Sequence, residues 1–263
     1  MISVIMGVYN PRNKDIFNLS LQSILNQTYS NFEFIICDDG SNEATREMLD
    51  EAAALDERVK VIHNNGNQGL AFSLNHCLEI AQGDYIARMD DDDISSPSRF
   101  EIERKFLDEH PDIAWVGCNA DLIDAEGVVW GNRKLEEYPT TNSLLFNSPF
   151  IHPTVMIRRE VIKKADGYSV AKQTRRAEDY DLWLRLYAMG YRGANIQETL
   201  FQYREDAFAY TKRKYRYRID EAIVRYQGFS RLKLFPVAWI YVLKPLVVGL
   251  IPGWLLRKMR ARY

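Results

Sequence analysis

Short apolar runs alternate with amphipathic segments through the first 93 residues. The apolar runs lie at residues 2–8, 32–37, 59–62 and 85–87. Each is rich in Val, Ile, Phe or Tyr and stops at a polar turn, which is typical of buried strands. Between them, apolar positions recur at helical spacing in residues 17–25, 44–55 and 70–81. Gly69 opens the third predicted helix, and Gly83 ends it.

The second half of the chain shows a similar pattern. A helix is predicted from Ser96-Pro97 to residue 107, and strands are predicted at 113–118, 128–130 and 153–157. Residues 124–127 read as the turn between the first two of these strands. A last helix begins at Ala177 to Tyr180 and turns its apolar side chains inward. We expect this half to form the wall opposite a ligand site.

Strands that alternate with helical segments of about ten to fifteen residues predict right-handed βαβ units. The predicted fold class is therefore α/β, a mostly parallel, Rossmann-like sheet flanked by helices. In such sheets, ligands bind beyond the carboxyl ends of the strands. Polar clusters follow three predicted strands, at residues 9–10, 38–39 and 90–93, so we expect them to share one cleft. The chain lacks both GxGxxG after its first strand and GxxxxGK[ST], so phosphate would be bound by metal and side chains.

Residues Asp90 to Asp93 are four consecutive carboxylates. Their mutual repulsion is costly unless a cation compensates it. Hard oxygen ligands suit Mg²⁺ or Mn²⁺, which share one or two carboxylates with substrate phosphates. A solvated acidic turn and a calcium loop are the alternatives. In a calcium loop Glu101 would take the twelfth position, but Ile94 and Ser95 stand where an oxygen ligand and the turn glycine belong.

Composition and charge narrow the class of protein. The 263 residues can bury a full core as one large domain with an extension. A net charge of −2 gives no field that attracts nucleic acid, so no nucleic-acid partner is expected. Cys37, Cys77 and Cys118 lie in apolar stretches without CxxC spacing, which indicates reduced core thiols. The N-terminus reads as a strand rather than a signal peptide, so we expect the catalytic part to stay in the cytoplasm.

The C-terminal part is both basic and apolar. Residues 204–218 carry six Lys or Arg against two acids, and residues 257–262 carry four against none. Residues 234–256 hold one charge, Lys244, and are long enough to cross a bilayer. Lys244 and three prolines instead favour short helices that lie on the membrane surface, through residues 231–262. A spanning helix, a tail packed on the core and a homodimer contact are the alternatives.

Several stretches resemble the family 2 glycosyltransferases with a GT-A fold, inverting enzymes that use nucleotide-diphosphate sugars. The matching stretches are residues 3–10, 33–41, 67–71, 89–93, 152–156 and 178–185. Together they span about residues 1–205 in order. The resemblance implies a GT-A domain at 1–205, with a nucleotide-binding half at 1–93 and an acceptor half at 94–205. Residues 206–263 are then a C-terminal, membrane-associating helical extension.

The resemblance also implies roles at the nucleotide site. Tyr9 and Asn10 would border the base, and Asp39 would accept a hydrogen bond from it. Asp92 would bind the Mn²⁺ or Mg²⁺ ion that bridges the two phosphates. The other residues implied in nucleotide-sugar binding are Val8, Asn67, Gly69, Arg88, Asp91 and, near the ribose, Asp90. Asp91 stands where the family often has alanine, so the register within the four acids stays open.

The resemblance assigns catalysis to Asp179. One carboxylate must take the proton of the acceptor hydroxyl as it attacks the anomeric carbon. Glu178 is the alternative base, and an acid pair can also simply complement a helix N-terminus. His152 and Trp183 are candidates for the acceptor site, with a place in the core as the alternative for each.

Arg204 is the remaining candidate in the acceptor half. With residues 212–214 it forms either a lid over the diphosphate or a solvated basic face. The chain departs from the family here, because Glu205-Asp206 stands where many relatives have His. It also has Leu74 where relatives often carry Arg.

The implied function is metal-dependent transfer of a sugar from a nucleotide-sugar donor to a saccharide acceptor in cell-surface polysaccharide synthesis. UDP is the expected nucleotide, with dTDP and GDP open. The expected acceptor is lipid-linked, and the expected location is the cytoplasmic face of the plasma membrane, as a peripheral or monotopic protein. A non-catalytic partner with this fold and a sugar nucleotidyltransferase are the alternatives.

Overall fold

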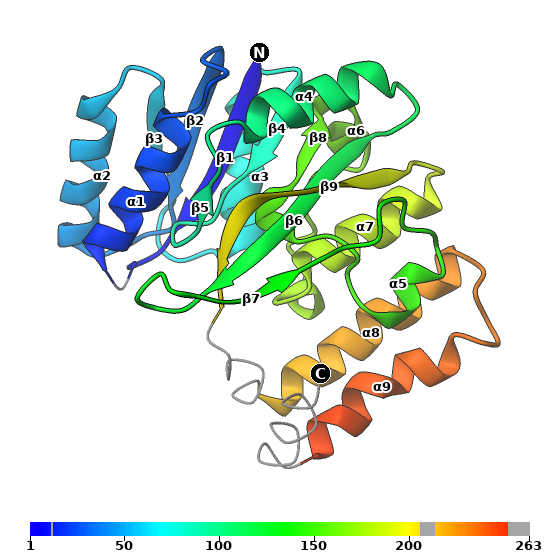
Figure 1. The fold of residues 1–263 in the computed structure, drawn as a ribbon. Coiled ribbons are helices and arrows are strands. Elements are labelled where there is room, and N and C mark those ends of the chain that lie inside the picture. Colours follow the sequence, from blue (N-terminus) through cyan, green and yellow to red (C-terminus); the bar gives the residue numbers. More distant parts are fainter. Residues whose placement is uncertain (12, 206–213, 252–263) are drawn as a thin grey trace.

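The computed structural model describes residues 1–11, 13–205 and 214–251 (Figure 1). Within these residues, nine strands form one sheet, with helices on both of its faces. The strands are β1 Ile2–Val8, β2 Phe32–Asp38, β3 Val59–His63, β4 Tyr85–Arg88, β5 Ile94–Ser95, β6 Trp115–Ile123, β7 Val129–Arg133, β8 Met156–Arg158 and β9 Gly193–Arg204. The helices are α1 Lys14–Leu25, α2 Glu43–Leu55, α3 Leu70–Ile80, α4 Arg99–Glu109, α5 Ser143–Phe146, α6 Arg159–Lys164, α7 Glu178–Ala188, α8 Tyr215–Arg231 and α9 Trp239–Leu250.

The sheet is parallel in its first half and mixed in its second. Its strand order is β3-β2-β1-β4-β8-β6-β9-β5, with β7 paired to β6. The first four of these strands are parallel, as the βαβ pattern predicts. β8 is antiparallel to both β4 and β6, whereas β6 and β9 are parallel. The parallel half brings the ends of β1, β2 and β4 to one edge.

Side chains of successive residues in the central strands enter opposite cores. Val4 and Met6 of β1 pack with α1, α2 and α4, and Ile5 between them packs with α3 and α7. This alternation follows from the two-residue period of a strand. Cys37, Cys77 and Cys118 are buried free thiols in these cores, as expected. Both faces of the sheet are thus covered, and the strand ends remain accessible.

The structure adds β5, α5, α6 and α8, which were not predicted, and it differs from the predicted elements in three further places. α3 ends at Ile80, and Gly83 follows it, where a Cβ would come within 2.5 Å of the Ser3 backbone nitrogen. Gly83 therefore serves close chain packing rather than the helix end. The predicted strand at 153–157 begins as a 3₁₀ turn, His152–Thr154, and only Met156–Arg158 is strand.

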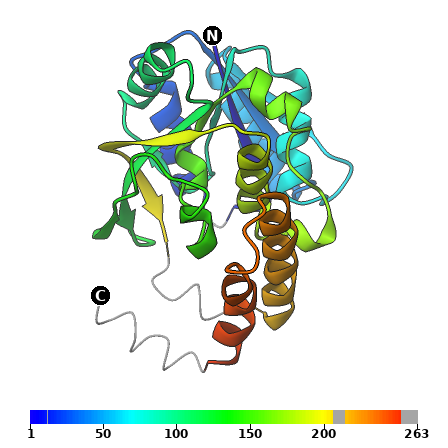
Figure 2. The ribbon, with the colours of Figure 1, turned by 90° about the vertical axis from the view of Figure 1, so that its right-hand side faces the viewer.

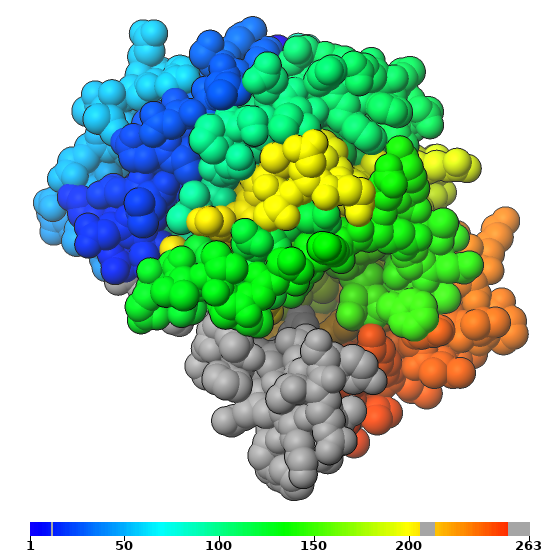
Figure 3. Space-filling model, in the orientation of Figure 1, coloured from blue at the N-terminus to red at the C-terminus, as the bar shows by residue number. Residues whose placement is uncertain are grey.

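β9 is the third difference, because no strand was predicted there. β9 crosses the face seen in Figure 3 between α4 and β7. Its buried and exposed residues do not alternate along the strand. Register shifts at residues 118–120 of its partner β6 break the two-residue period.

α8 and α9 form a helical hairpin below the sheet (Figure 2). Arg225 of α8 is buried and donates through Nη1 to the carbonyl of Leu145 at 2.9 Å. Lys244 of α9 donates to the carbonyl of Phe146 at 2.7 Å. The cation in the apolar C-terminal run thus ties α9 to the end of α5.

The membrane-spanning alternative concerned residues 234–256, of which the structure describes residues 234–251. α9 has 12 residues and contains Pro245. In residues 1–11, 13–205 and 214–251, no helix is long and apolar enough to cross a bilayer. Residues 252–262 of the predicted membrane-surface segment lie outside the described residues.

Candidate active site

A cleft of about 600 Å³ opens where β1, β2 and β4 end. The polar clusters that follow these three strands contribute to it, as the fold prediction requires. Its opposite wall comes from residues 169–176 and from Tyr217 of α8. The candidate residues in its lining are Tyr9, Asp39, Asn67, Gly69, Asp90, Asp91 and Glu178. Residues far apart in the sequence therefore share one site.

Three hydrogen bonds hold the carboxylate of Asp39, which lines this cleft. Its Oδ1 accepts hydrogen bonds from Asn64 Nδ2 and from the Gln68 backbone, both at 2.8 Å. Its Oδ2 accepts one from the backbone of Gly69 at 2.8 Å. Gly69 has a φ of 92°, which a residue with a Cβ rarely adopts. The loop before α3 thus supplies two backbone donors that fix the carboxylate.

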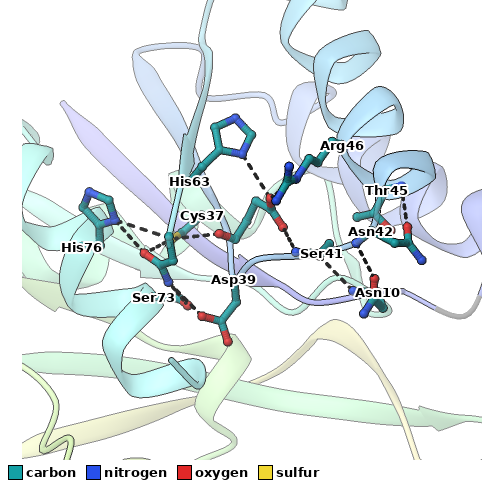
Figure 4. Close-up of polar contacts among 12 residues, drawn as sticks. Asn10, Cys37, Asp39, Ser41, Asn42, Thr45, Arg46, His63, Ser73 and His76 are labelled. Carbon is teal, nitrogen blue, oxygen red and sulfur yellow. Dashed lines mark hydrogen bonds and ion pairs between the residues drawn. The ribbon is translucent and has the colours of Figure 1, made fainter. Parts of the chain in front are cut away.

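Val8 and Asn10 shape the cleft without lining it. Val8 is 1% exposed, and its carbonyl accepts from the Asp39 backbone at 2.8 Å. Asn10 donates from its backbone to Ser41 Oγ at 3.1 Å and accepts from the Asn42 backbone at 2.9 Å (Figure 4). These bonds tie the turn after β1 to the turn after β2.

Arg88 is a buried residue that holds the acidic run through an ion pair with Asp90. Its side chain is 2% exposed, and Nη2 donates to Asp90 Oδ1 at 2.5 Å. The carbonyl of Asp90 also accepts from Ser20 Oγ at 2.8 Å. A buried guanidinium therefore fixes one carboxylate of the run, and this ion pair also offsets part of the charge repulsion among the acids.

Burial and repulsion between carboxylates raise the pKa of each of the other three acids in the run. Burial and the neighbouring carboxylates raise the pKa of Asp91 to about 7. Asp92 is exposed and is not among the residues that line the cleft, yet reduced hydration and the Asp90 charge raise its pKa to about 6. Burial and the same neighbours also raise the pKa of Asp93. Additional positive charge beside Asp91 and Asp92 would relieve this repulsion.

These carboxylates fit a divalent cation that is shared with substrate. Among the described residues, no group of three or more His, Cys, Asp or Glu is arranged to hold a metal by itself. Mg²⁺ and Mn²⁺ commonly take one or two carboxylates and complete their shell with phosphate and water. Asp91 and Asp92 supply carboxylate oxygens, which are the donor type that this mode of binding uses.

Asp179 lies in a separate, smaller cavity of about 160 Å³, at the first turn of α7. Burial and the adjacent Glu178 charge raise its pKa to about 6. Glu178 faces the main cleft instead. Arg176 lines both cavities, so they are neighbours. The two candidate bases thus line two different cavities that adjoin at Arg176.

Two acceptor-site candidates lie away from the cleft lining. Trp183 is 1% exposed and stacks on Trp115, with ring centroids 5.3 Å apart. His152 shares a 2.8 Å hydrogen bond between its Nε2 and the hydroxyl of Tyr168. Burial and the nearby Arg88 charge hold the pKa of His152 well below its usual range. Trp183 is thus packed in the core, and His152 is partly buried against Tyr168.

Arg204 binds the acidic turn. Its backbone nitrogen donates to Asp93 Oδ1 at 2.7 Å, and its Nε donates to the Asp92 carbonyl at 2.8 Å. Its Nη1 donates to the Ala125 carbonyl at 3.0 Å. Arg204 therefore links the acidic turn to the β6–β7 hairpin. Residues 212 and 213 of the predicted lid lie outside the described residues.

Sequence reasoning missed Asn64 and the wall at residues 169–176. Asn64 directly follows β3, whose carboxyl end lies beside that of β2. That position was the available signal, because polar residues after parallel strands meet at one edge. No local pattern marks residues 169–176, because they reach the cleft only through the tertiary fold.

Comparison with known proteins identifies relatives along most of the chain. The sequence model of Glycosyl transferase family 2 matches residues 3–166. EpsE of Bacillus subtilis (strain 168), provisionally named a glycosyltransferase, is 43% identical over 253 residues, which cover 96% of this chain and 90% of the relative. The O-antigen biosynthesis glycosyltransferase WbnJ of Escherichia coli is 38% identical over 209 residues, covering 78% and 79%.

Solved structures share the fold at low sequence identity. S. aureus TarS 1–349 in complex with UDP-GlcNAc gives a TM-score of 0.68 at 18% identity, covering 95% of this chain and 71% of that one. The mannosyltransferase PcManGT from Pyrobaculum calidifontis, in complex with GDP-Man and Mn²⁺, gives 0.64 at 18% identity, covering 99% and 79%. The expected GT-A fold is confirmed.

Proposed function

The chain belongs to glycosyl transferase family 2 and is a glycosyltransferase, and we propose that it transfers the sugar of a UDP-sugar, with inversion, to a hydroxyl of a lipid-linked or growing saccharide. The observation that carries the proposal is the cleft that Tyr9, Asp39, Asp90 and Asp91 line together. It combines an aromatic side chain, a fixed acceptor and an anionic end, which are the groups needed for a base, a ribose and a metal-bound diphosphate. The structure of a TarS fragment with UDP-GlcNAc and the name of WbnJ support the donor and the polysaccharide context.

The nucleotide would lie along the strand ends. Tyr9 is 51% exposed, so its ring is available to stack on the base. Asp39 accepts a hydrogen bond from the ring, and Asp90, fixed by Arg88, accepts one from the ribose. Asn67 and Gly69 form the loop that borders the base. These contacts orient the donor so that its diphosphate meets Asp91 and Asp92.

Asp92, with Asp91 beside it, would hold a divalent cation, Mn²⁺ or Mg²⁺. When bound, the cation neutralises the charge that develops on the leaving diphosphate. PcManGT, solved with Mn²⁺, supports this class of cofactor. Arg204 keeps the carboxylates in place by holding the backbone of Asp92.

Asp179 would act as the general base. A carboxylate with a pKa of about 6 is ionised at neutral pH and is more basic than an ordinary aspartate. It takes the proton of the acceptor hydroxyl as that oxygen bonds to the anomeric carbon, while the bond to the diphosphate breaks. We place the acceptor hydroxyl in the cavity of Asp179, next to the donor cleft across Arg176.

Nucleotide binding is expected to raise the thermal unfolding temperature. UDP at about 100 times its dissociation constant adds roughly 2.7 kcal/mol of stability, or roughly 5–10 °C for a domain of this size. Thermal scans with UDP, dTDP and GDP, each with Mn²⁺ and with a chelator, measure this shift. A shift by UDP that depends on Mn²⁺ supports the proposed donor site. Absence of a shift with all three nucleotides contradicts it.

We further propose that the α8–α9 hairpin binds an anionic lipid surface, on the cytoplasmic face of the plasma membrane. Both helices carry exposed apolar side chains at helical spacing. They are Tyr215, Ile219, Ile223 and Tyr226 on α8, and Trp239, Ile240, Leu243, Val247 and Leu250 on α9. Exposed basic residues lie near them, including Arg216, Arg231 and Lys233. Apolar side chains beside cations suit the boundary between acyl chains and anionic headgroups, where a lipid-linked acceptor would be found.

Replacing Ile240 and Leu250 together by Glu is expected to weaken vesicle binding at least about 10-fold. Each is 74% exposed, and burial of such a side chain contributes about 1.5–3 kcal/mol. Flotation with phosphatidylglycerol-containing vesicles measures the bound fraction. Leu19→Glu, at a 54% exposed position on α1, is the matched control and should bind like the wild type. A wild-type protein that stays unbound at low salt contradicts the proposal.

A further inference from the structure

A chain of hydrogen-bonded polar side chains connects α3 to Asp39, which lines the cleft (Figure 4). Asn64, which is 6% exposed, is its centre. Its Nδ2 donates to Asp39 Oδ1 at 2.8 Å and to Ser73 Oγ at 3.0 Å. Its Oδ1 lies 2.9 Å from Nδ1 of His76, a half-buried residue of α3, and accepts a hydrogen bond from Cys37 Sγ at 3.4 Å. The chain therefore runs from α3 through Asn64 to the carboxylate that faces the nucleotide site.

The direction of the Asn64 amide follows from its partners. An ionised carboxylate only accepts hydrogen bonds, so Asp39 requires the NH₂ group of Asn64. The amide oxygen must then face His76, and the Nδ1 atom of His76 must carry a hydrogen. A reversed amide would put two acceptors against each other at Asp39. His76 and Cys37 thus support the orientation of Asn64 in which Asp39 is bound.

This orientation determines what Asp39 can still accept. A carboxylate has about four acceptor positions. In the part of the chain that the structure describes, two donors reach Oδ1 and one reaches Oδ2. The next hydrogen bond therefore falls on Oδ2, and Asp39 lines the cleft. Uracil and thymine offer one imide N–H there, whereas guanine offers two adjacent donors and cytosine offers an acceptor.

We propose that Asn64, oriented by His76, is a positioning residue that sets Asp39 to receive a single imide N–H, so that the site selects uridine or thymidine diphosphates. The inference rests on the proposed function, because it concerns the donor of that reaction. Asn64 and the Gln68 backbone both donate to Oδ1 of Asp39, so Oδ2 of Asp39 is left to accept a hydrogen bond from the nucleobase. Ser73 holds the second amide hydrogen and keeps Asn64 from rotating.

The test compares UDP with 3-methyl-UDP, which lacks the imide N–H. The wild type is expected to bind UDP about 10-fold or more tightly than the methylated analogue, because a hydrogen bond to a charged group is lost. Asn64→Leu keeps the branched shape of the side chain and removes both amide hydrogens. Because Gln68 and Gly69 still bind Asp39 in this variant, the ratio of the two dissociation constants should fall clearly below the wild-type value without vanishing. Binding of inorganic pyrophosphate with Mn²⁺, which has no base, should stay unchanged.

Two His76 variants separate positioning from folding. His76→Phe removes the shorter of the two contacts to Asn64 Oδ1, leaves the weaker thiol donor of Cys37, and should reduce the ratio. His76→Gln keeps a strong donor and should retain most of the ratio. A ratio that is unchanged in both Asn64→Leu and His76→Phe overturns the inference, as does equal loss of UDP and pyrophosphate binding. A wild type that prefers GDP to UDP overturns it too, while leaving the glycosyltransferase site intact. A wild type that binds no nucleotide contradicts the proposed function itself.

Discussion

Asp179→Asn is expected to lower sugar transfer by about 10²–10⁴-fold, the usual contribution of a general base. The amide cannot take the proton of the acceptor hydroxyl, but it has nearly the size of the carboxylate. Because Asp179 lies in the neighbouring cavity rather than in the donor cleft, the affinity for UDP should stay within about 2-fold of the wild type. Steady-state transfer rates and calorimetric titration with UDP measure the two quantities.

Glu178→Gln is the matched control, because it removes the neighbouring carboxylate, which lines the donor cleft. It should retain most of the transfer rate if Asp179 is the base. The pH profile gives a second readout. With a pKa of about 6, Asp179 loses its proton as the pH rises through 6, so the rate should climb there and level off above about 7. Full activity in Asp179→Asn together with a large loss in Glu178→Gln would assign the base to Glu178 instead.

Removal of the divalent cation is also expected to lower sugar transfer strongly. A metal that neutralises a leaving diphosphate contributes several kcal/mol to the transition state, so a chelator should lower transfer by about 100-fold or more. Asp92→Asn should lower transfer similarly and should make UDP affinity insensitive to Mn²⁺. Transfer assays and UDP titrations with and without Mn²⁺ provide the comparison.

Asp50→Asn, at an exposed position on α2, changes the net charge equally and serves as the control. It should leave both transfer and the response to Mn²⁺ as in the wild type. If Asp92→Asn keeps the response to Mn²⁺ and Asp91→Asn loses it, the metal ligand is Asp91. If transfer is unaffected by a chelator, the metal requirement itself is wrong.

Residues 1–93 were the most predictable part of the molecule. Its strands and helices follow from local periodicity, and parallel βαβ units have one common handedness. Asp39 and Asp90 could be placed together from the sequence because each follows a strand of that sheet. β9 could not be predicted, because its burial depends on a shifted register against β6.

The sequence by itself determined the alternation of strands and helices, the edge at which the acidic run lies and the family to which the chain belongs. These features depend on the order and spacing of residues along the chain, because helices and strands each have a fixed side-chain period. Only the tertiary structure decided that Asp179 and Glu178 enter different cavities, and that Arg204 holds the acidic turn. It also decided that Asn64 and His76 stand behind Asp39. Such contacts depend on how loops from distant segments pack, and no short-range pattern specifies that.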